Sequence, residues 1–134
     1  MLFDADLLEH IRQVSREGVS SDDDRVIADL LLMHPEFDPI WNDPEVDPTK
    51  PREIGGEIVN PFVHIALHLI VGKQIRQGAP SQSKKAYLHL VERGENDHGA
   101  LHLIMGWYGK LYFESVRRSD SFDEARYVQG LAAL

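Results

Sequence analysis

Residues 60–71 constrain this chain more than any other stretch, and they read Asn-Pro-Phe-Val-His-Ile-Ala-Leu-His-Leu-Ile-Val. Asparagine is a favourable helix N-cap and proline is favoured at the first helical position, so the pattern predicts a helix over 61–77 that Gly78 closes. This helix is apolar on nearly every side, apart from His64 and His68. Buried imidazoles without partners would cost about 1–3 kcal/mol each, so these two histidines need a role.

A second pair with the same spacing, His98 and His102, lies at the start of a predicted helix over 97–118. Residues four apart on a helix share one face, so each pair can grip a metal ion as a chelate. Zinc, iron and nickel all accept imidazole nitrogen. We therefore predict one divalent transition-metal site formed by His64, His68, His98 and His102.

The order of the helices supports this hypothesis. If the segments 61–77, 83–93 and 97–118 run up, down and up, the first and third are parallel. Both histidine pairs then lie near the N-terminal ends of their helices, and packed helix axes are about 8–10 Å apart. We therefore expect the imidazoles of His64 and His102 to approach a common point.

Two alternatives stay open for these histidines. Core histidines are often held by a carboxylate or a carbonyl, which would make the protein a non-catalytic helical interaction or structural module. The pairs could also handle protons without a metal. Outside the two pairs, we interpret His34, which precedes Pro35, as a helix terminator rather than a fifth ligand. His10 and His89 are interpreted as surface or rim residues.

Helical periodicity through the chain predicts an all-α fold, a single small bundle of about five to six helices and one domain over 1–134. Besides the central helix, the expected helices cover 4–16, 21–33, 83–93, 97–118 and a last segment that begins with a capping box at 121–124. Prolines and glycines interrupt residues 35–59, which we expect to form a long loop with a short helical turn at its start. No segment shows the alternating apolar pattern of a strand.

The part of this loop at 42–59 is expected to be non-helical and more mobile than the flanking helices. Loops of this length are uncommon in compact domains and are either functional or merely mobile. A passive surface crossover is the favoured interpretation. The alternative is a lid that brings Glu53 or Glu57 to the histidines, where a carboxylate could act as a base or a metal ligand.

Charge and composition limit the classes of binding partner and of metal site that this chain can have. The net charge of −8 disfavours both nucleic acid and anionic membrane surfaces as partners. The absence of cysteine excludes disulfides and thiolate metal sites. No apolar run approaches the roughly 20 residues of a membrane-spanning helix, and the acidic N-terminus lacks a signal-like core. We therefore expect a cytoplasmic protein, and a homo-oligomer is compatible with the sequence.

Several motifs resemble a family of short bacterial proteins, the domain-of-unknown-function 1841 family, over about residues 25–130. The motifs that carry the resemblance are His34-Pro35-Glu36-Phe37, Asn60-Pro61-Phe62-Val63-His64-Ile65-Ala66-Leu67-His68, Asp97-His98 with His102 and Met105, and Tyr127. The resemblance implies a helical architecture and the histidine motifs, and it implies no substrate.

The chain departs from that family in its second histidine motif. The family typically has His-Glu-Ala-Glu-His, whereas residues 98–102 read His-Gly-Ala-Leu-His. If those glutamates are ligands or bases in relatives, this chain lacks them, which weakens the case for catalysis more than the case for metal binding. A metal-dependent hydrolase and a redox protein both remain open, and neither is favoured.

Overall fold

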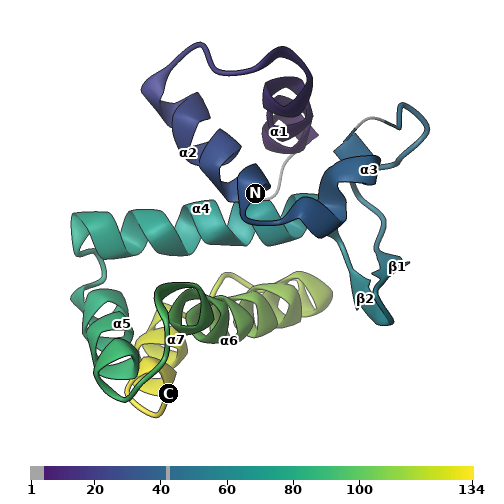
Figure 1. Ribbon diagram of the computed structural model, residues 1–134. Helices are drawn as coiled ribbons and strands as arrows, with labels where there is room; N and C mark the ends of the chain where they lie inside the picture. Colours follow the sequence, from purple (N-terminus) through teal and green to yellow (C-terminus); the bar gives the residue numbers. More distant parts are fainter. Residues whose placement is uncertain (1–4, 42) are drawn as a thin grey trace. The chain divides into compact units, whose positions relative to one another are not determined.

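The computed structural model describes residues 5–41 and 43–134. The described residues form seven α-helices, one 3-10 helix and one antiparallel hairpin, which confirms the predicted all-α class. Their bounds are α1 Ala5–Glu17, α2 Asp22–Leu32, η1 Pro35–Phe37, α3 Asp38–Trp41, β1 Arg52–Ile54, β2 Glu57–Val59, α4 Pro61–Gln77, α5 Ser81–Glu92, α6 Asp97–Arg118 and α7 Glu124–Leu131 (Figure 1). The chain divides into two compact units, Met1–Leu69 and Ile70–Leu134, and α4 runs from one into the other. The single domain stays a prediction.

The first unit pairs α1 with α2, and the expected end of α1 and start of α2 are confirmed, whereas the expected start of α1 at residue 4 lies outside the described residues. Gly18 closes α1 in the left-handed region, with φ of 85°. Ser21 caps α2 by accepting a hydrogen bond from the backbone N–H of Asp24. The core of this unit consists of apolar side chains from α1, α2, the 35–41 turns and the start of α4, namely Leu8, Ile11, Val14, Ile27, Phe37, Ile40, Trp41, Val46, Phe62 and Ile65.

The segment between α3 and α4 contains the hairpin, which the sequence did not predict. Strands β1 and β2 pair in antiparallel register, with Arg52 opposite Val59, and Gly55 and Gly56 form the turn with φ of 61° and 87°. Each strand has only three residues, too few to show an alternating pattern, so the expectation of no strand was wrong here. The described residues 43–59 are non-helical, as predicted.

Two hydrogen bonds fasten this segment to α1 and to the start of α4. The guanidinium Nη2 of Arg12 donates to the carbonyl of Val46 at 2.5 Å, and the amide Nδ2 of Asn60 donates to the carbonyl of Pro48 at 3.1 Å. The Arg12 guanidinium also lies 5.2 Å from the ring centre of Phe62, in cation–π range. The segment is therefore attached at defined points before it reaches the hairpin.

The second unit packs α5, α6 and α7 together (Figure 1). Helix α6 has the predicted bounds, and Asn96 caps it by accepting from the backbone N–H of Gly99. Helix α5 begins at Ser81, two residues before the predicted start. The capping box predicted at 121–124 was wrong, because the carboxylate of Asp123 caps α7 instead.

A polar network lies inside this unit. The hydroxyl of Tyr127 donates to Gln74 Oε1 at 2.6 Å, and the hydroxyl of Ser83 donates to the same oxygen at 2.8 Å. The indole N–H of Trp107 donates to the carbonyl of Tyr127 at 2.9 Å. Burial raises the pKa of Tyr127 and of Tyr108, so both phenols stay neutral and act as hydrogen-bonding core residues.

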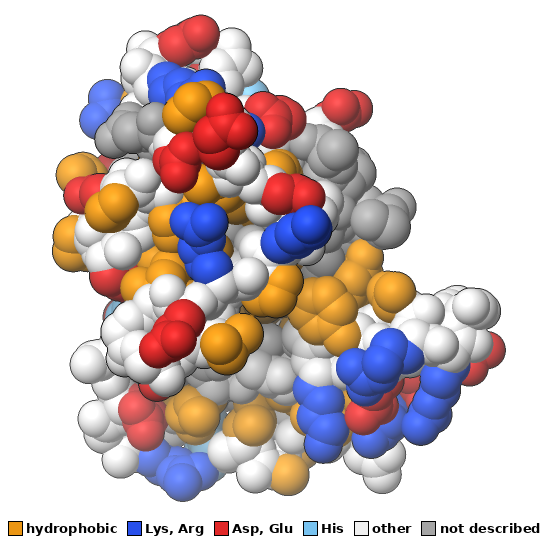
Figure 2. All heavy atoms as spheres, turned by 90° about the vertical axis from the view of Figure 1, so that its right-hand side faces the viewer, with side chains coloured by type: hydrophobic (Ala, Val, Ile, Leu, Met, Phe, Trp, Pro, Cys, Tyr) orange, Lys and Arg blue, Asp and Glu red, His pale blue; other side chains and the backbone are white. Residues whose placement is uncertain are grey.

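The surface in Figure 2 shows acidic, basic and apolar side chains interspersed on one face. Within the described part of the chain, no helix is both long and apolar enough to cross a membrane.

Candidate metal centre

His34 is held in place by the end of α2 and the start of η1. It follows the last turn of α2 and precedes Pro35, which opens η1, so its backbone has little freedom. The side chain is buried, and its Nδ1 lies 2.7 Å from the carbonyl oxygen of Leu30. A carbonyl only accepts hydrogen bonds, so Nδ1 carries the hydrogen of this contact and Nε2 is the ring nitrogen that could bind a metal.

His64 and His68 come from the first turns of α4. The side chain of Asn60 caps this helix, accepting from the backbone N–H of Phe62 at 3.0 Å and of Val63 at 3.2 Å. With the helix start fixed, the two imidazoles project from one face. The spacing of four residues therefore places the two imidazoles next to each other.

The three side chains form a cluster, hereafter the histidine cluster: His34, His64 and His68. The Nε2 of His34 lies 3.1 Å from Nε2 of His64 and 3.2 Å from Nε2 of His68. The nitrogens that each residue could offer to a metal all lie within 4.8 Å of one another. The whole histidine cluster belongs to the first unit.

These separations fit shared coordination. Nitrogens that bind one tetrahedral ion at about 2.0–2.1 Å are about 3.3 Å apart, and the centres of their rings are about 5 Å apart. The ring centres in the histidine cluster are 4.8, 4.8 and 5.0 Å apart. The distances are also within hydrogen-bond range, but Nε2 of His34 has one in-plane lone pair and cannot accept two N–H groups well.

Phe37 forms an apolar wall beside the histidine cluster. Its ring is stacked on the ring of His34, with centres 5.4 Å apart and planes 4° apart. It meets the ring of His64 edge-on, with centres 5.5 Å apart. Phe37 is itself buried, so it restricts how far these two imidazoles can turn and excludes water from that side.

Comparison with known proteins identifies the family but no activity. Residues 6–133 match the sequence model of a family described as a domain of unknown function, DUF1841. The chain belongs to this family. No curated protein and no solved structure matches it. Because the DUF1841 description carries no reaction, the function of this DUF1841 member must be argued from its histidines.

The other histidine pair of this DUF1841 chain lies in the second unit. His98 and His102 are in the first two turns of α6, as predicted, and their ring centres are 4.0 Å apart with planes at 60°. That separation is a direct contact, shorter than the roughly 5 Å expected for two rings on one ion. Their participation in a common site with His64 and His68 stays a prediction.

The remaining histidines discussed above, His10 and His89, and the candidate carboxylates of Glu53 and Glu57 all lie at the surface. His10 is 45% exposed and bonds to Asp24 at 2.8 Å, and His89 is exposed, which confirms both as surface or rim residues. Glu53 and Glu57 are exposed on the hairpin. The exposure of these two carboxylates therefore gives the lid hypothesis no support.

Sequence reasoning missed His34. The interpretation of His34 as a helix terminator was incomplete, since α2 does end before it but its imidazole also joins the cluster. The signal that could have found it was present: the motif with Pro35 and Phe37 fixes a histidine between two rigid turns. Its partners lie 30 and 34 residues later, a distance that helical spacing does not reveal.

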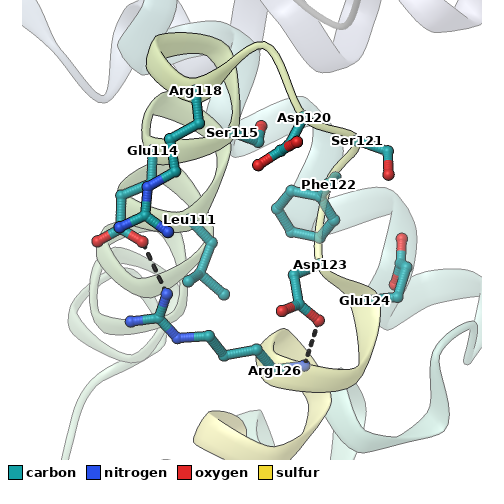
Figure 3. Close-up of a pocket in the computed structure, with 10 residues that line it drawn as sticks. All are labelled: Leu111, Glu114, Ser115, Arg118, Asp120, Ser121, Phe122, Asp123, Glu124 and Arg126. Carbon is teal, nitrogen blue, oxygen red and sulfur yellow. Dashed lines mark hydrogen bonds and ion pairs between the residues drawn. The ribbon is translucent and has the colours of Figure 1, made fainter.

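The largest hollow by volume among those described lies in the second unit and carries different chemistry. It measures about 410 Å³ and is bounded by the end of α6 and the start of α7 (Figure 3). Arg126 forms an ion pair with Glu114 at 2.8 Å across it, and the carboxylate of Asp123 accepts from the backbone N–H of Arg126. These charged groups already bond to each other, so the hollow is a weaker candidate than the histidine cluster.

Proposed function

We propose that this protein binds a divalent transition-metal ion through His34, His64 and His68. The observation that carries the proposal is the convergence of three Nε2 atoms, with Nε2 of His34 3.1 Å from that of His64 and 3.2 Å from that of His68. The hydrogen bond from His34 Nδ1 to the Leu30 carbonyl supports it, because metal-ligating histidines usually donate their other N–H to a carbonyl or carboxylate.

The donor set favours the zinc, iron and nickel expected from the sequence. Imidazole nitrogen suits these ions, whereas magnesium, calcium and manganese prefer oxygen. Among the residues that the structure describes, the group of side chains close enough to share an ion contains histidine alone. We propose metal binding and not a particular reaction, since the candidate bases Glu53 and Glu57 are exposed.

The second pair enters this proposal as the source of a further ligand. His98 and His102 lie near the N-terminal end of α6, as His64 and His68 lie near that of α4, which is the sequence argument for a common site. We propose that one of them, and not both, joins the ion, since their rings contact each other. His98→Ala and His102→Ala, compared in metal affinity, would separate the two.

The alternative function is a helical interaction or structural module. The N–N distances of 3.1 and 3.2 Å support it, because they also suit imidazole hydrogen bonds. In that case the histidine cluster would hold the end of α2 against α4 without any ion. The two functions differ in whether purified protein contains metal.

The test is elemental analysis of protein purified without added metal and without chelator. The proposal expects about one transition-metal ion per chain, lost when His34 is replaced by alanine and retained in His89→Ala. His89 is the matched control because it is an exposed histidine on α5, outside the cluster. Metal-free protein that also fails to take up zinc, iron or nickel on titration would favour the structural module.

A further inference from the structure

A second hollow of the second unit, hereafter the α5–α7 hollow, lies where α5 packs against the end of α7 (Figure 1). It measures about 260 Å³, somewhat less than the roughly 300–1,000 Å³ of pockets that take drug-sized ligands. A smaller molecule is therefore the size class that it suits. Its wall consists of Gln82, Lys85, Ala86 and His89 from α5, with Leu131 and Ala132 from the end of α7.

The floor of the α5–α7 hollow is apolar. Ala86 and Leu131 are the buried members of its wall, with exposed fractions of 7% and 2%. Alanine at positions 86 and 132 gives each side of the contact a short side chain, so the side chains do not fill the space between the helices. A hydrocarbon group that entered this space would leave water and would cover apolar surface.

The rim of the α5–α7 hollow carries the positive charge of Lys85. This side chain is exposed, and it forms no ion pair within the described part of the chain. The positions three and four residues away on either side hold serine, glutamine, leucine and histidine, and no carboxylate. The acidic residue of α5 is Glu92, about two turns further along the helix. Lys85 is therefore placed to meet the charge of a ligand.

From the apolar floor and the cation at its edge, we infer that the α5–α7 hollow binds a small amphipathic monoanion, a carboxylate with a short hydrocarbon chain. The hydrocarbon chain covers Ala86 and Leu131, and the carboxylate meets the ammonium group of Lys85. The net charge of −8 opposes anions at long range, but salt screens that field beyond about 10 Å. Affinity therefore depends on the contact with Lys85 and on the apolar floor.

The test uses the full chain labelled with nitrogen-15 and titrated with sodium hexanoate at constant pH and ionic strength, while NMR records the amide chemical shifts. Hexylammonium has a similar chain with the opposite charge, and 1-hexanol is neutral. The inference expects saturable shifts in residues 82–89 and 130–133. Hexanoate should bind most tightly and hexylammonium most weakly.

Four variants assign the binding to the hollow. Lys85→Gln should weaken hexanoate binding by about two- to five-fold, as expected for an exposed charge pair, and should leave the binding of 1-hexanol unchanged. Lys84→Gln is the matched control, because Lys84 is an exposed neighbour outside the wall of the hollow. Ala132→Leu fills the hollow and should abolish the binding of both ligands, whereas Ala133→Leu, at the next exposed alanine, should bind hexanoate as wild type does.

Three outcomes would overturn the inference. Hexanoate that causes no saturable shift does so directly. Equal affinity for hexanoate and 1-hexanol, unchanged in Lys85→Gln, shows an apolar contact without selectivity for anions. Shifts of the same amides when ligand-free protein is diluted show that a second copy of the chain occupies the hollow. Each outcome leaves the proposed metal site untouched, since no residue of the histidine cluster lines the hollow.

Discussion

The two units bury different kinds of side chain. Among the described residues, the buried arginine, aspartate and histidine side chains, which are Arg12, Asp24, His34 and His68, all lie in the first unit. The second unit buries phenols and the hydroxyl of Ser83, which forms a hydrogen bond with the hydroxyl of Tyr127. Buried groups that can carry charge need partners or a metal, whereas neutral hydroxyls need only hydrogen bonds.

This difference has a consequence for stability. The first unit should respond to metal and to acid, because its buried groups change charge or bind ions. The second unit should respond mainly to the loss of packing and of neutral hydrogen bonds. The following predictions test this contrast, from the largest expected effect to the smallest.

The largest effect is expected for His34→Ala. It removes the nitrogen that the two α4 imidazoles approach, so metal affinity should fall by more than about 100-fold, beyond the 10–100-fold typical of groups that only orient a ligand. Competition with a metal-responsive dye measures it, with His89→Ala as the control. Wild-type affinity in His34→Ala would show that the ion lies elsewhere.

Chelation should destabilise the first unit selectively. An ion bound only by the native state, at a free concentration about 100 times its dissociation constant, contributes about 2.7 kcal/mol. A chelator should therefore lower the melting temperature of wild type. His68→Ala should melt at a lower temperature than metal-bound wild type, and the chelator should not change its melting temperature. Amide hydrogen exchange locates the destabilised region. After chelation, the exchange rate should increase in residues 30–41 and stay the same in α7.

A wild-type melting curve that ignores the chelator, after elemental analysis shows that the metal is gone, would contradict this prediction. If chelation increased the exchange rate in α7 as much as in residues 30–41, the contrast between the units would be wrong, even if the melting temperature fell.

Most helices could be predicted because their signals are local. The ends of α4 follow from Asn60, Pro61 and Gly78, and the stripe of apolar residues in α1 shows its buried face. The hairpin could not be predicted in this way, since three-residue strands carry almost no pattern. The predicted N-cap of α7 was wrong by two residues. Ser121 and Asp123 are both good N-cap residues, and the local sequence does not show which of them is used.

The candidate site shows the same division. The spacing of His64 and His68 is visible in the sequence because one helix fixes it. The approach of His34 depends on how the end of α2 packs against α4, which is a tertiary contact over 30 residues. A spacing motif therefore identified two of the three clustered imidazoles and not the third.

Asp24 should make the first unit sensitive to acid. The hydroxyl of Ser20 and then its backbone N–H donate to this carboxylate, and His10 adds a smaller effect, so the pKa of Asp24 lies below its usual value. A depressed pKa contributes stability above the pKa of the unfolded chain, and this is lost as the pH falls through the folded value. Wild type should therefore lose unfolding free energy in acid more steeply than Asp24→Asn.

Urea unfolding of both proteins at neutral and at acidic pH measures this difference. Asp24→Asn should be the less stable protein at neutral pH and should change less on acidification. Parallel decreases in the two proteins would show that Asp24 does not control the acid response.

In the second unit, Tyr127→Phe should cost about 1 kcal/mol, the usual net value of one hydrogen bond. The variant loses the bond to Gln74, while Ser83 still donates to that oxygen, so no acceptor is left without a partner. Thermal unfolding measures the loss. Metal affinity should be unchanged, and a weakened metal site in this variant would break the contrast between the units.

The smallest effect is expected for Glu57→Gln, which removes the charge of an exposed hairpin residue and keeps its shape. Surface substitutions of this kind change unfolding free energy by about 0.5 kcal/mol or less. Glu53→Gln is the matched control on the facing strand, since Glu53 pairs with Ile58. If the segment is a passive crossover, as the bonds from Arg12 and Asn60 favour, we expect both variants to bind metal as wild type does. If Glu57→Gln alone weakened metal binding, a carboxylate would have to reach the ion, the ligand set would no longer be neutral, and the hairpin would be a lid.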